Sequence, residues 1–329
     1  MMLKKPDVSE EYMQSQVASL AERLSLQSID DACYFPKFVQ IETIRHCNAR
    51  CPFCPVDTWD MSQPLMKDAL FEKIIDELSG YTDWIENVNI SRSGEPLLDK
   101  KIASRIKRAK DAGLKFVMIQ TNGSLLDEKK ATAILEAGID QVYISMDSID
   151  QETYEKMRVR LDYDTVVANI KNFFRLRNEI RPSTMIRVRS ICPYPSEPEF
   201  REAMRRWLAF WEPHTGPNDR LQFKPLHNWG NNKSWDAASP DSDTVYDPCI
   251  SVWSTLNVTA MGTVALCCQD TDAKVLLGDV NTQSLADVWR GHEFQAVRDK
   301  HSSGNRNDIN FCIGCRSFDP EHSTIELDN

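Results

Sequence analysis

The chain alternates short apolar runs with amphipathic stretches over most of its length. Residues 8–28 place apolar side chains at helical spacing and predict an amphipathic helix. Apolar, β-rich segments then recur at residues 37–44, 85–91, 115–121, 140–146, 184–191 and 220–226, with helical patterns between them. Parallel strands need crossover connections, so this repeat predicts an α/β fold with a parallel sheet and helices outside it. Six units rather than eight predict a partial (β/α)6 barrel.

The pattern changes after the sixth β-rich segment. Residues 227–248 are polar and predict a linker that borders a functional site. Segments 256–259 and 263–266, separated by a turn that contains Gly262, predict a β-hairpin, and a helix is expected at about 284–299. The predicted domains are an N-terminal helical extension at 1–36, the partial barrel at 37–226, the linker at 227–248 and a small hairpin-plus-helix domain at 249–329.

Composition narrows the class of protein. A hydrophobic fraction of 41% suits one large or two modest globular domains, and a net charge of −10 argues against a nucleic-acid partner. No apolar run approaches the ~18 residues that span a bilayer, and the N-terminus lacks a signal-peptide pattern, so no membrane partner is expected. Ten cysteines in such a chain indicate metal binding or catalysis rather than disulfides. We therefore expect a cytoplasmic protein.

Three cysteines within eight residues are the most informative chemical feature. Cys47, Cys51 and Cys54 have CxxxCxxC spacing and follow the first predicted strand, at the strand end where barrel-like α/β folds carry their chemistry. Three thiolates can hold three irons of a cubane cluster and leave the fourth open to a small molecule. Zinc sites usually pair CxxC with a second pair or with His, so the spacing favours iron–sulfur over a zinc knuckle or an incidental group of thiols.

With Phe53 before its last cysteine, this stretch resembles the cluster motif of the radical S-adenosylmethionine (radical SAM) superfamily. The resemblance implies a [4Fe–4S] cluster whose open iron chelates the amino and carboxylate groups of SAM. It also implies reductive cleavage of SAM to a 5′-deoxyadenosyl radical that abstracts hydrogen from a substrate. An electron donor of the flavodoxin or ferredoxin type is the partner expected for that reduction.

The end of the second predicted strand is similar to the family's GGEP motif. Ser93 stands in place of the first glycine and is followed by Gly94 and Glu95. The resemblance implies that this segment meets the SAM amino group. A glycine permits close approach to a ligand, and a carboxylate or carbonyl is a suitable partner for an ammonium group.

The third and fourth predicted strands end in segments similar to the family's TNG and S-x-D motifs. Asn122 and Ser145 are the residues expected to contact the ribose, and Asp147 belongs to the same set. Arg158 or Arg160 is a candidate charge partner for the methionyl carboxylate, because Arg offers a bidentate fork.

A second set of cysteines lies in the C-terminal segment. Cys249, Cys267, Cys312 and Cys315 match a site ligated by four thiolates, with structural zinc as the generic alternative. Their spacing resembles the SPASM/twitch extension of radical SAM proteins, which implies an auxiliary [4Fe–4S] cluster. No cysteine follows Cys315, as in the shorter twitch form with one auxiliary cluster. Cys268 is an alternative ligand to its neighbour Cys267.

The layout resembles the twitch-bearing aminocyclitol dehydrogenases of aminoglycoside biosynthesis. The leading hypothesis is a radical oxidoreductase that oxidises an alcohol of a small polar, carbohydrate- or cyclitol-like substrate, with the auxiliary cluster as electron acceptor. Polar residues of the fifth and sixth predicted strands and of the linker are candidates for substrate contacts: Arg187, Arg189, Lys224, His227, Asn228, Trp229, Asn231 and Asn232.

Three alternatives stay open. A radical epimerase needs a thiol that returns a hydrogen atom, for which Cys192 is the better candidate and Cys268 the second, although a lone Cys is usually a small core residue. Peptide modification usually needs a leader-binding domain of ~80 residues, which the 36 residues before the first strand are not expected to supply. A non-catalytic electron carrier would leave the strand-end motifs without a role. The substrate itself is not identified by any motif.

Overall fold

A computed structural model describes residues 9–192, 196–225, 245–315, 318 and 325–326 of the chain. Its core is a parallel sheet in which consecutive strands are neighbours, each followed by helical structure. The six parallel strands are β1 (Phe38–Ile41), β2 (Asn87–Asn89), β3 (Val117–Thr121), β4 (Gln141–Ser145), β5 (Met185–Cys192) and β6 (Arg220–Pro225). The predicted partial α/β barrel is confirmed.

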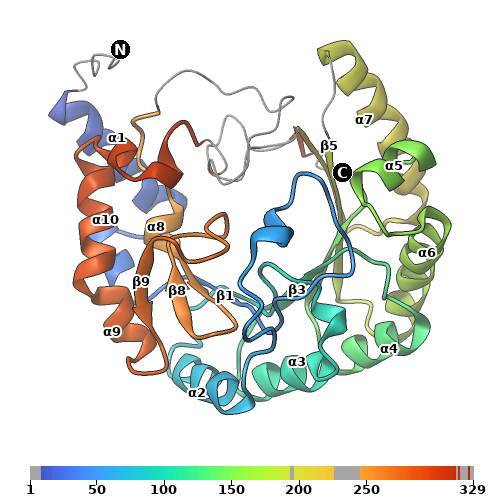
Figure 1. Cartoon of the computed structure of the whole chain (residues 1–329), viewed down its shortest axis with the longest axis horizontal. Helices are drawn as coiled ribbons and strands as arrows, with labels where there is room; N and C mark the ends of the chain where they lie inside the picture. The colour runs from blue at the N-terminus through green and yellow to red at the C-terminus, as the bar shows by residue number, and fades with distance from the viewer. Residues whose placement is uncertain (1–8, 193–195, 226–244, 316–317, 319–324, 327–329) are drawn as a thin grey trace.

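The helices follow the outer side of the sheet (Figure 1). They are α1 (Glu10–Arg23), α2 (Asp68–Ser79), α3 (Ile102–Asp111), α4 (Glu128–Glu136), α5 (Gln151–Met157), α6 (Tyr163–Ile180), α7 (Glu197–Trp211), α8 (Ser251–Ser254), α9 (Leu285–Arg290) and α10 (His292–Ser302). Several begin with a side-chain cap: Asp127 and Asp162, for example, accept hydrogen bonds from the backbone of the first turns of α4 and α6. No helix in the described part of the chain combines the length and hydropathy needed to cross a bilayer.

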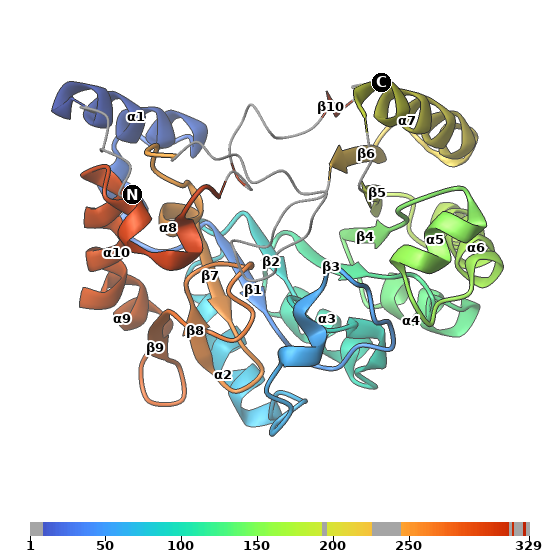
Figure 2. The ribbon, with the colours of Figure 1, turned by 45° about the horizontal axis from the view of Figure 1, so that its top comes forward.

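Three C-terminal strands extend the barrel sheet instead of forming a separate one. The predicted hairpin is present as β7 (Thr255–Val258) and β8 (Thr263–Ala265), and β9 (Leu276–Asp279) pairs antiparallel with β8. β7 pairs in parallel with β1, so the ten-stranded sheet runs in the order β10-β6-β5-β4-β3-β2-β1-β7-β8-β9, where β10 is Ile325–Glu326. The edge strands β9 and β10 are the two ends of this order and lie apart in Figure 2, which leaves the barrel open.

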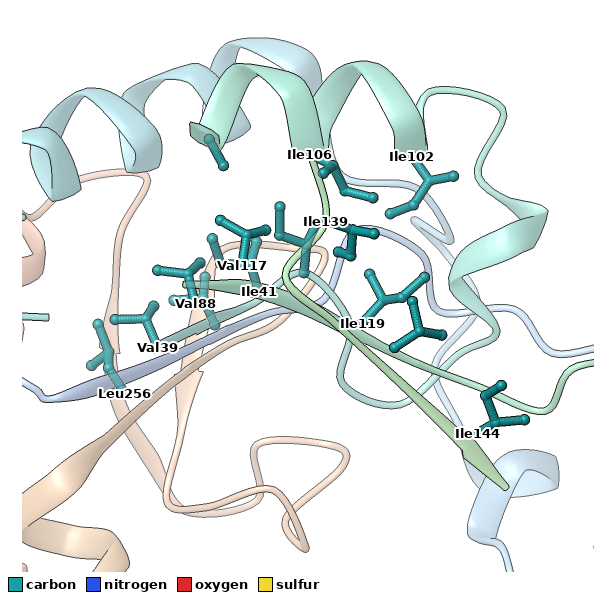
Figure 3. Close-up of a cluster of buried hydrophobic side chains, with 14 of the residues drawn as sticks. Val39, Ile41, Val88, Ile102, Ile106, Val117, Ile119, Ile139, Ile144 and Leu256 are labelled. Carbon is teal, nitrogen blue, oxygen red and sulfur yellow. The ribbon is translucent and has the colours of Figure 1, made fainter. Parts of the chain in front are cut away.

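The two faces of the barrel sheet differ in chemistry because side chains alternate along each strand. Branched apolar side chains point at the helices and are buried, as Figure 3 shows for Val39, Val88, Val117, Ile119 and their neighbours. The alternate positions face the inside of the barrel and are mostly polar, although Phe38 and Met118 also lie on this face. The polar positions include Asn89, Tyr143, Arg187, Arg189 and Gln222.

Two predicted helices differ in extent. The helix expected at 8–28 ends at Arg23, and Ser25 follows with a positive φ of 53°. The helix expected at 284–299 is divided at Gly291 into α9 and α10. A Cβ at Gly291 would lie 2.9 Å from the carbonyl oxygen of Asp287, so this close approach accounts for a glycine at the break. Of the predicted linker, residues 227–244 lie outside the described residues.

Candidate functional site

The first cysteine set lies on the segment between β1 and α2. Cys51 is buried, and Cys47 and Cys54 are partly buried. Burial, together with the neighbouring thiols, raises the pKa of Cys47 to about 11 and that of Cys54 to about 12. Buried thiols that affect one another in this way become thiolates only beside a strong positive charge. This donor chemistry fits an iron cluster held by Cys47, Cys51 and Cys54.

Gly94 packs directly against the backbone that leads into these cysteines. A Cβ at Gly94 would lie 2.3 Å from the carbonyl oxygen of Ile44 and 2.7 Å from that of His46. The next residue, Glu95, donates its backbone N–H to the His46 carbonyl at 2.8 Å. This close approach docks the end of β2 on the cysteine segment, and the expected approach of Gly94 to a ligand stays a prediction.

The Glu95 side chain connects the ends of β2 and β3. Its carboxylate accepts hydrogen bonds from the Leu97 N–H at 3.1 Å, the Thr121 hydroxyl at 2.7 Å and the Asn122 N–H at 2.7 Å. Burial raises the pKa of Glu95, although these donors lower it. The carboxylate thus holds the ends of β2 and β3 together, and the expected contact of this segment with the SAM amino group stays a prediction. Ser93 is partly exposed, and its hydroxyl lies 3.3 Å from Arg92 Nη1.

Asn122 lies beside the cysteine segment, and its expected contact with the ribose stays a prediction. Its Nδ2 donates to Asn48 Oδ1 at 2.9 Å and lies 3.9 Å from Cys47 Sγ. Its Oδ1 accepts the Ser124 backbone N–H at 3.0 Å. The amide side chain is thereby fixed between the end of β3 and the first cysteine.

Buried Asp147 and partly buried Arg158 form an ion pair beside Cys51. Arg158 donates through Nε to Asp147 at 2.5 Å and through Nη2 at 3.1 Å, and its Nη1 lies 3.7 Å from Cys51 Sγ. Its guanidinium also lies 5.3 Å from the centre of the Phe53 ring. Asp147 accepts the Ile191 N–H at 2.9 Å, which ties the pair to β5. Burial lowers the pKa of Arg158, but Asp147 more than compensates and the pKa is raised.

Arg158 thus connects Asp147 with the cysteine segment. The expected contact between Arg158 and the methionyl carboxylate stays a prediction. Arg160, the other candidate, is exposed and has a positive φ of 77°. Ser145 ends β4, is partly exposed and lies in register with Arg189 of β5.

The second cysteine set is assembled from three separate segments. Burial, together with the thiol of Cys315, raises the pKa of Cys249 to about 11 and that of Cys312 to about 12. Cys267 and Cys268 both lie close enough to Cys315 for its thiol to raise their pKa values as well. The four predicted ligands are thus brought together, with Cys268 beside them.

His301 is a buried residue of this second site that sequence reasoning missed. It is fully buried on α10, its Nδ1 accepts the Cys249 N–H at 3.1 Å, and its Nε2 lies 3.6 Å from Cys312 Sγ. Arg306 is also buried and donates to the carbonyl oxygens of Asp247 at 2.6 Å and Cys315 at 2.8 Å. Neither residue belongs to a motif, because both positions become informative only when α10 is packed on the cysteines.

No three His, Cys, Asp or Glu side chains in the described part of the chain are arranged around a single metal ion. A cubane does not require three side chains around one ion, because each of its irons is held by a separate thiolate. Buried, mutually adjacent thiols are the donor chemistry that a cubane uses at both sites.

A buried ion cluster joins the two sites. Arg92, from the end of β2, donates to the carbonyl oxygens of Cys267 at 3.1 Å, Thr271 at 3.2 Å and Asp270. Its Nη1 lies 3.7 Å from Glu42, whose side chain is fully buried. Arg45, on the segment before the first cysteine, adds a bond to the Thr271 carbonyl at 2.8 Å. Arg92 was overlooked within the strand-end motif, yet it connects the segment of the first site to a predicted ligand of the second.

The inner face of β4, β5 and β6 is lined by polar and cationic groups. The guanidinium groups of Arg187 and Arg189 lie 5.4 Å and 4.6 Å from the Tyr143 ring centre, and the Tyr143 hydroxyl hydrogen-bonds with Gln222. Lys224 occupies the next inward position of β6. Cys192 is the last residue of β5. The substrate candidates His227, Asn228, Trp229, Asn231 and Asn232 lie outside the described residues.

Two family models match separate parts of the chain. The model of the Radical SAM superfamily matches residues 41–187, which hold the first cysteine set and the strand ends. The model of the SPASM iron–sulfur cluster-binding domain matches residues 249–316, which hold the second set.

Individual relatives and structures agree with these matches. The chain is 26% identical over 155 residues to the tungsten-containing aldehyde ferredoxin oxidoreductase cofactor-modifying protein of Pyrococcus furiosus, a match that covers 46% of this chain and 43% of the relative. The fold of this chain is similar to that of BtrN in complex with AdoMet and 2-DOIA. The TM-score is 0.58 at 18% identity, and the match covers 90% of this chain and 98% of BtrN. SuiB of Streptococcus suis bound to precursor peptide SuiA gives a TM-score of 0.64 at 13% identity, covering 87% and 70% of the two chains.

Proposed function

Because the chain belongs to the radical SAM superfamily and carries a SPASM iron–sulfur cluster-binding domain, we propose that it oxidises an alcohol of a small polar substrate to a ketone. Its cofactors are SAM with a [4Fe–4S] cluster and an auxiliary iron–sulfur cluster. When bound, these groups supply a 5′-deoxyadenosyl radical, by one-electron cleavage of SAM, and a one-electron acceptor. The remaining chemistry belongs to the chain: it binds the alcohol, orients its C–H bond and accepts the hydroxyl proton.

The second cysteine set is the observation that carries this proposal. Conversion of an alcohol to a ketone removes one hydrogen atom, one proton and one electron, so the electron needs an acceptor close to the substrate. Arg92 donates to the carbonyl oxygen of Cys267 while its own segment lies at the end of β2, which supports a short distance between the two sites. A site ligated by four thiolates has no open iron for substrate, which favours electron transfer as its role.

The inner face of the barrel supports a polar substrate. Arg187, Arg189 and Gln222 line β5 and β6 around the Tyr143 ring. Their hydrogen-bonding groups suit a hydroxyl-rich substrate. The likeness in fold to BtrN in complex with AdoMet and 2-DOIA also favours a small molecule. A flavodoxin- or ferredoxin-type protein is the electron donor that we infer for SAM cleavage.

Formation of 5′-deoxyadenosine tests the enzymatic part of the proposal. The anaerobically reconstituted protein should cleave SAM under strong reduction, and the Cys51→Ala variant should not, because one predicted thiolate ligand is missing. The Cys33→Ala variant is the matched control, since Cys33 lies in the short helix Ile29–Cys33 outside both cysteine sets. The proposal fails if the wild type produces no 5′-deoxyadenosine. About four irons with one zinc per chain, instead of about eight irons, would contradict the auxiliary cluster.

One observation favours a second candidate, a radical epimerase. Cys268 lies within electrostatic reach of Arg92 and of Arg189, which belongs to the inward-facing set of β5. A thiol at that place is a candidate hydrogen-atom donor to a substrate radical. The Cys268→Ala and Cys192→Ala variants separate the two reactions once their iron content is shown to be full, because Cys268 is also an alternative cluster ligand. At full iron content, an epimerase loses product formation in one of them, whereas ketone formation persists in both.

A further inference from the structure

We propose that His301 raises the reduction potential of the auxiliary cluster by donating a hydrogen bond to the Cys312 thiolate, and that it positions the two segments that carry Cys249 and Cys312. This inference rests on the proposed assignment of both cysteines as ligands. It assigns His301 as a positioning and tuning residue, without contact to substrate.

The His301 ring bridges two parts of the site that are distant in sequence. Its Nδ1 accepts the backbone N–H of Cys249 at 3.1 Å, and its Nε2 lies 3.6 Å from Cys312 Sγ, within reach of a hydrogen bond to sulfur. The ring is fully buried and packs edge-on against Trp253, with 6.2 Å between ring centres. Burial and two directional contacts hold it in a single orientation.

The contact with Cys249 determines which ring nitrogen carries the proton. A backbone N–H can only donate, so Nδ1 must be the unprotonated acceptor. A neutral imidazole then carries its hydrogen on Nε2, the atom that faces Cys312. The Cys249 backbone therefore selects the tautomer that presents an N–H donor to the sulfur.

An N–H donor to a ligand sulfur favours the more negative state of a cluster. Reduction adds one electron and, in this proposal, no proton, so the hydrogen bond strengthens on reduction and the potential rises. Arg306 adds a buried positive charge on the same side, donating to the Cys315 carbonyl at 2.8 Å. Beside Cys51, in contrast, the guanidinium of Arg158 is paired with Asp147. These contacts support the second site as the electron acceptor of the proposed function.

Two substitutions separate the contacts of His301. In the His301→Asn variant the shorter amide can still accept from the Cys249 N–H through Oδ1, but nothing donates to Cys312. In His301→Gln the longer side chain places an N–H donor near the position of Nε2. Both are made in full-length protein that also carries Cys47→Ala, Cys51→Ala and Cys54→Ala, so that only the auxiliary cluster is titrated.

The midpoint potential, followed by electron paramagnetic resonance, is the readout. We expect His301→Asn to lower the midpoint potential by about 59 mV, which corresponds to a tenfold change in a one-electron transfer equilibrium. His301→Gln should retain most of the wild-type potential. An unchanged potential in His301→Asn at full iron content overturns the inference. Full iron content in Cys312→Ala instead overturns the ligand assignment, and with it the auxiliary site in the proposed function.

A measurement on protein with the native His301 covers the case in which the variants do not fold. The Fe–S stretching bands of the auxiliary cluster in resonance Raman spectra should shift when the protein is exchanged into D2O, because an N–H···S bond becomes N–D···S. Bands that are insensitive to D2O would overturn the proposed hydrogen bond.

Discussion

Glu95, Arg158 and His301 each use several hydrogen bonds to fix a segment beside a cysteine. Glu95 accepts from Leu97, Thr121 and Asn122, and Arg158 contacts both Asp147 and Cys51. Buried polar groups that are satisfied in this way restrict the backbone around them to one arrangement. Cluster ligands depend on such partners for their orientation and for the potential of the group they hold.

The titration of Glu95 should be visible in the stability of the cofactor-free protein. Burial raises its pKa above the ordinary 4.5, so the folded state binds the proton more tightly than the unfolded chain. The stability from this group is fully present below pH 4.5 and is lost as pH rises through the folded-state pKa. The free energy of unfolding, measured with urea from about pH 4 to about pH 8, should therefore fall less steeply in Glu95→Gln than in the wild type. Glu152→Gln, an exposed position on α5, is the control, and parallel profiles for wild type and Glu95→Gln would contradict this reading.

At the scale of elements, the end of β2 and the segment after β1 form one structural unit. Gly94 allows the two backbones to touch, Glu95 extends the unit to β3, and Asp147 extends it through Arg158 to β5. The first cysteine set therefore depends on the ends of neighbouring strands that the parallel register brings side by side.

Substitution of Gly94 tests this unit. A Cβ in Gly94→Ala would lie 2.3 Å from the Ile44 carbonyl oxygen, so the cysteine segment must move. We expect the reconstituted variant to lose the SAM-binding cluster and keep the auxiliary one, with iron content falling from about eight to about four per chain. Gly80→Ala, where the nearest contact is an ordinary 3.5 Å, should keep both clusters. Full iron content and SAM cleavage in Gly94→Ala would show that the docking is not required.

The helices and strands could be predicted from the sequence better than their boundaries and the pairing of the strands. Six strands and the hairpin follow from alternation of apolar residues, since Val39, Val88 and Val117 must face the helices. The division at Gly291 and the pairing of β7 with β1 depend on contacts between distant segments, which periodicity does not encode. The cysteines could be found because their spacing is local. The roles of His301 and Arg92 and the contact of Arg158 with Cys51 could not, because each involves a partner far along the chain.

At the scale of the whole molecule, the two cysteine sets share one sheet and one buried ion cluster. β7 pairs with β1, so the hairpin that precedes Cys267 is continuous with the strand that precedes Cys47. Arg92, Glu42 and Arg45 then hold the segment Cys267–Asp272 against the barrel. This connection fixes the relation between the two sites.

Removal of the Arg92 guanidinium should loosen that connection. In Arg92→Met the carbonyl oxygens of Cys267, Asp270 and Thr271 lose their buried donor, and a partner of Glu42 is lost. We expect a loss of about 3 kcal/mol in the free energy of unfolding, with faster amide exchange in residues 267–272. Arg175→Met, which removes an exposed pair with Glu179 on α6, should change little. Equal stability and exchange in both variants would contradict the role of Arg92.

The fate of one hydrogen atom tests the central claim most directly. The reconstituted protein is incubated with SAM, reductant and a panel of cyclitols and aminocyclitols that carry deuterium on the carbinol carbons. Alcohol oxidation predicts one deuterium transferred to 5′-deoxyadenosine for each ketone formed, with no hydrogen returned to the product carbon. Recovery of an alcohol of inverted configuration, with solvent hydrogen in place of the deuterium, would contradict oxidation and identify an epimerase.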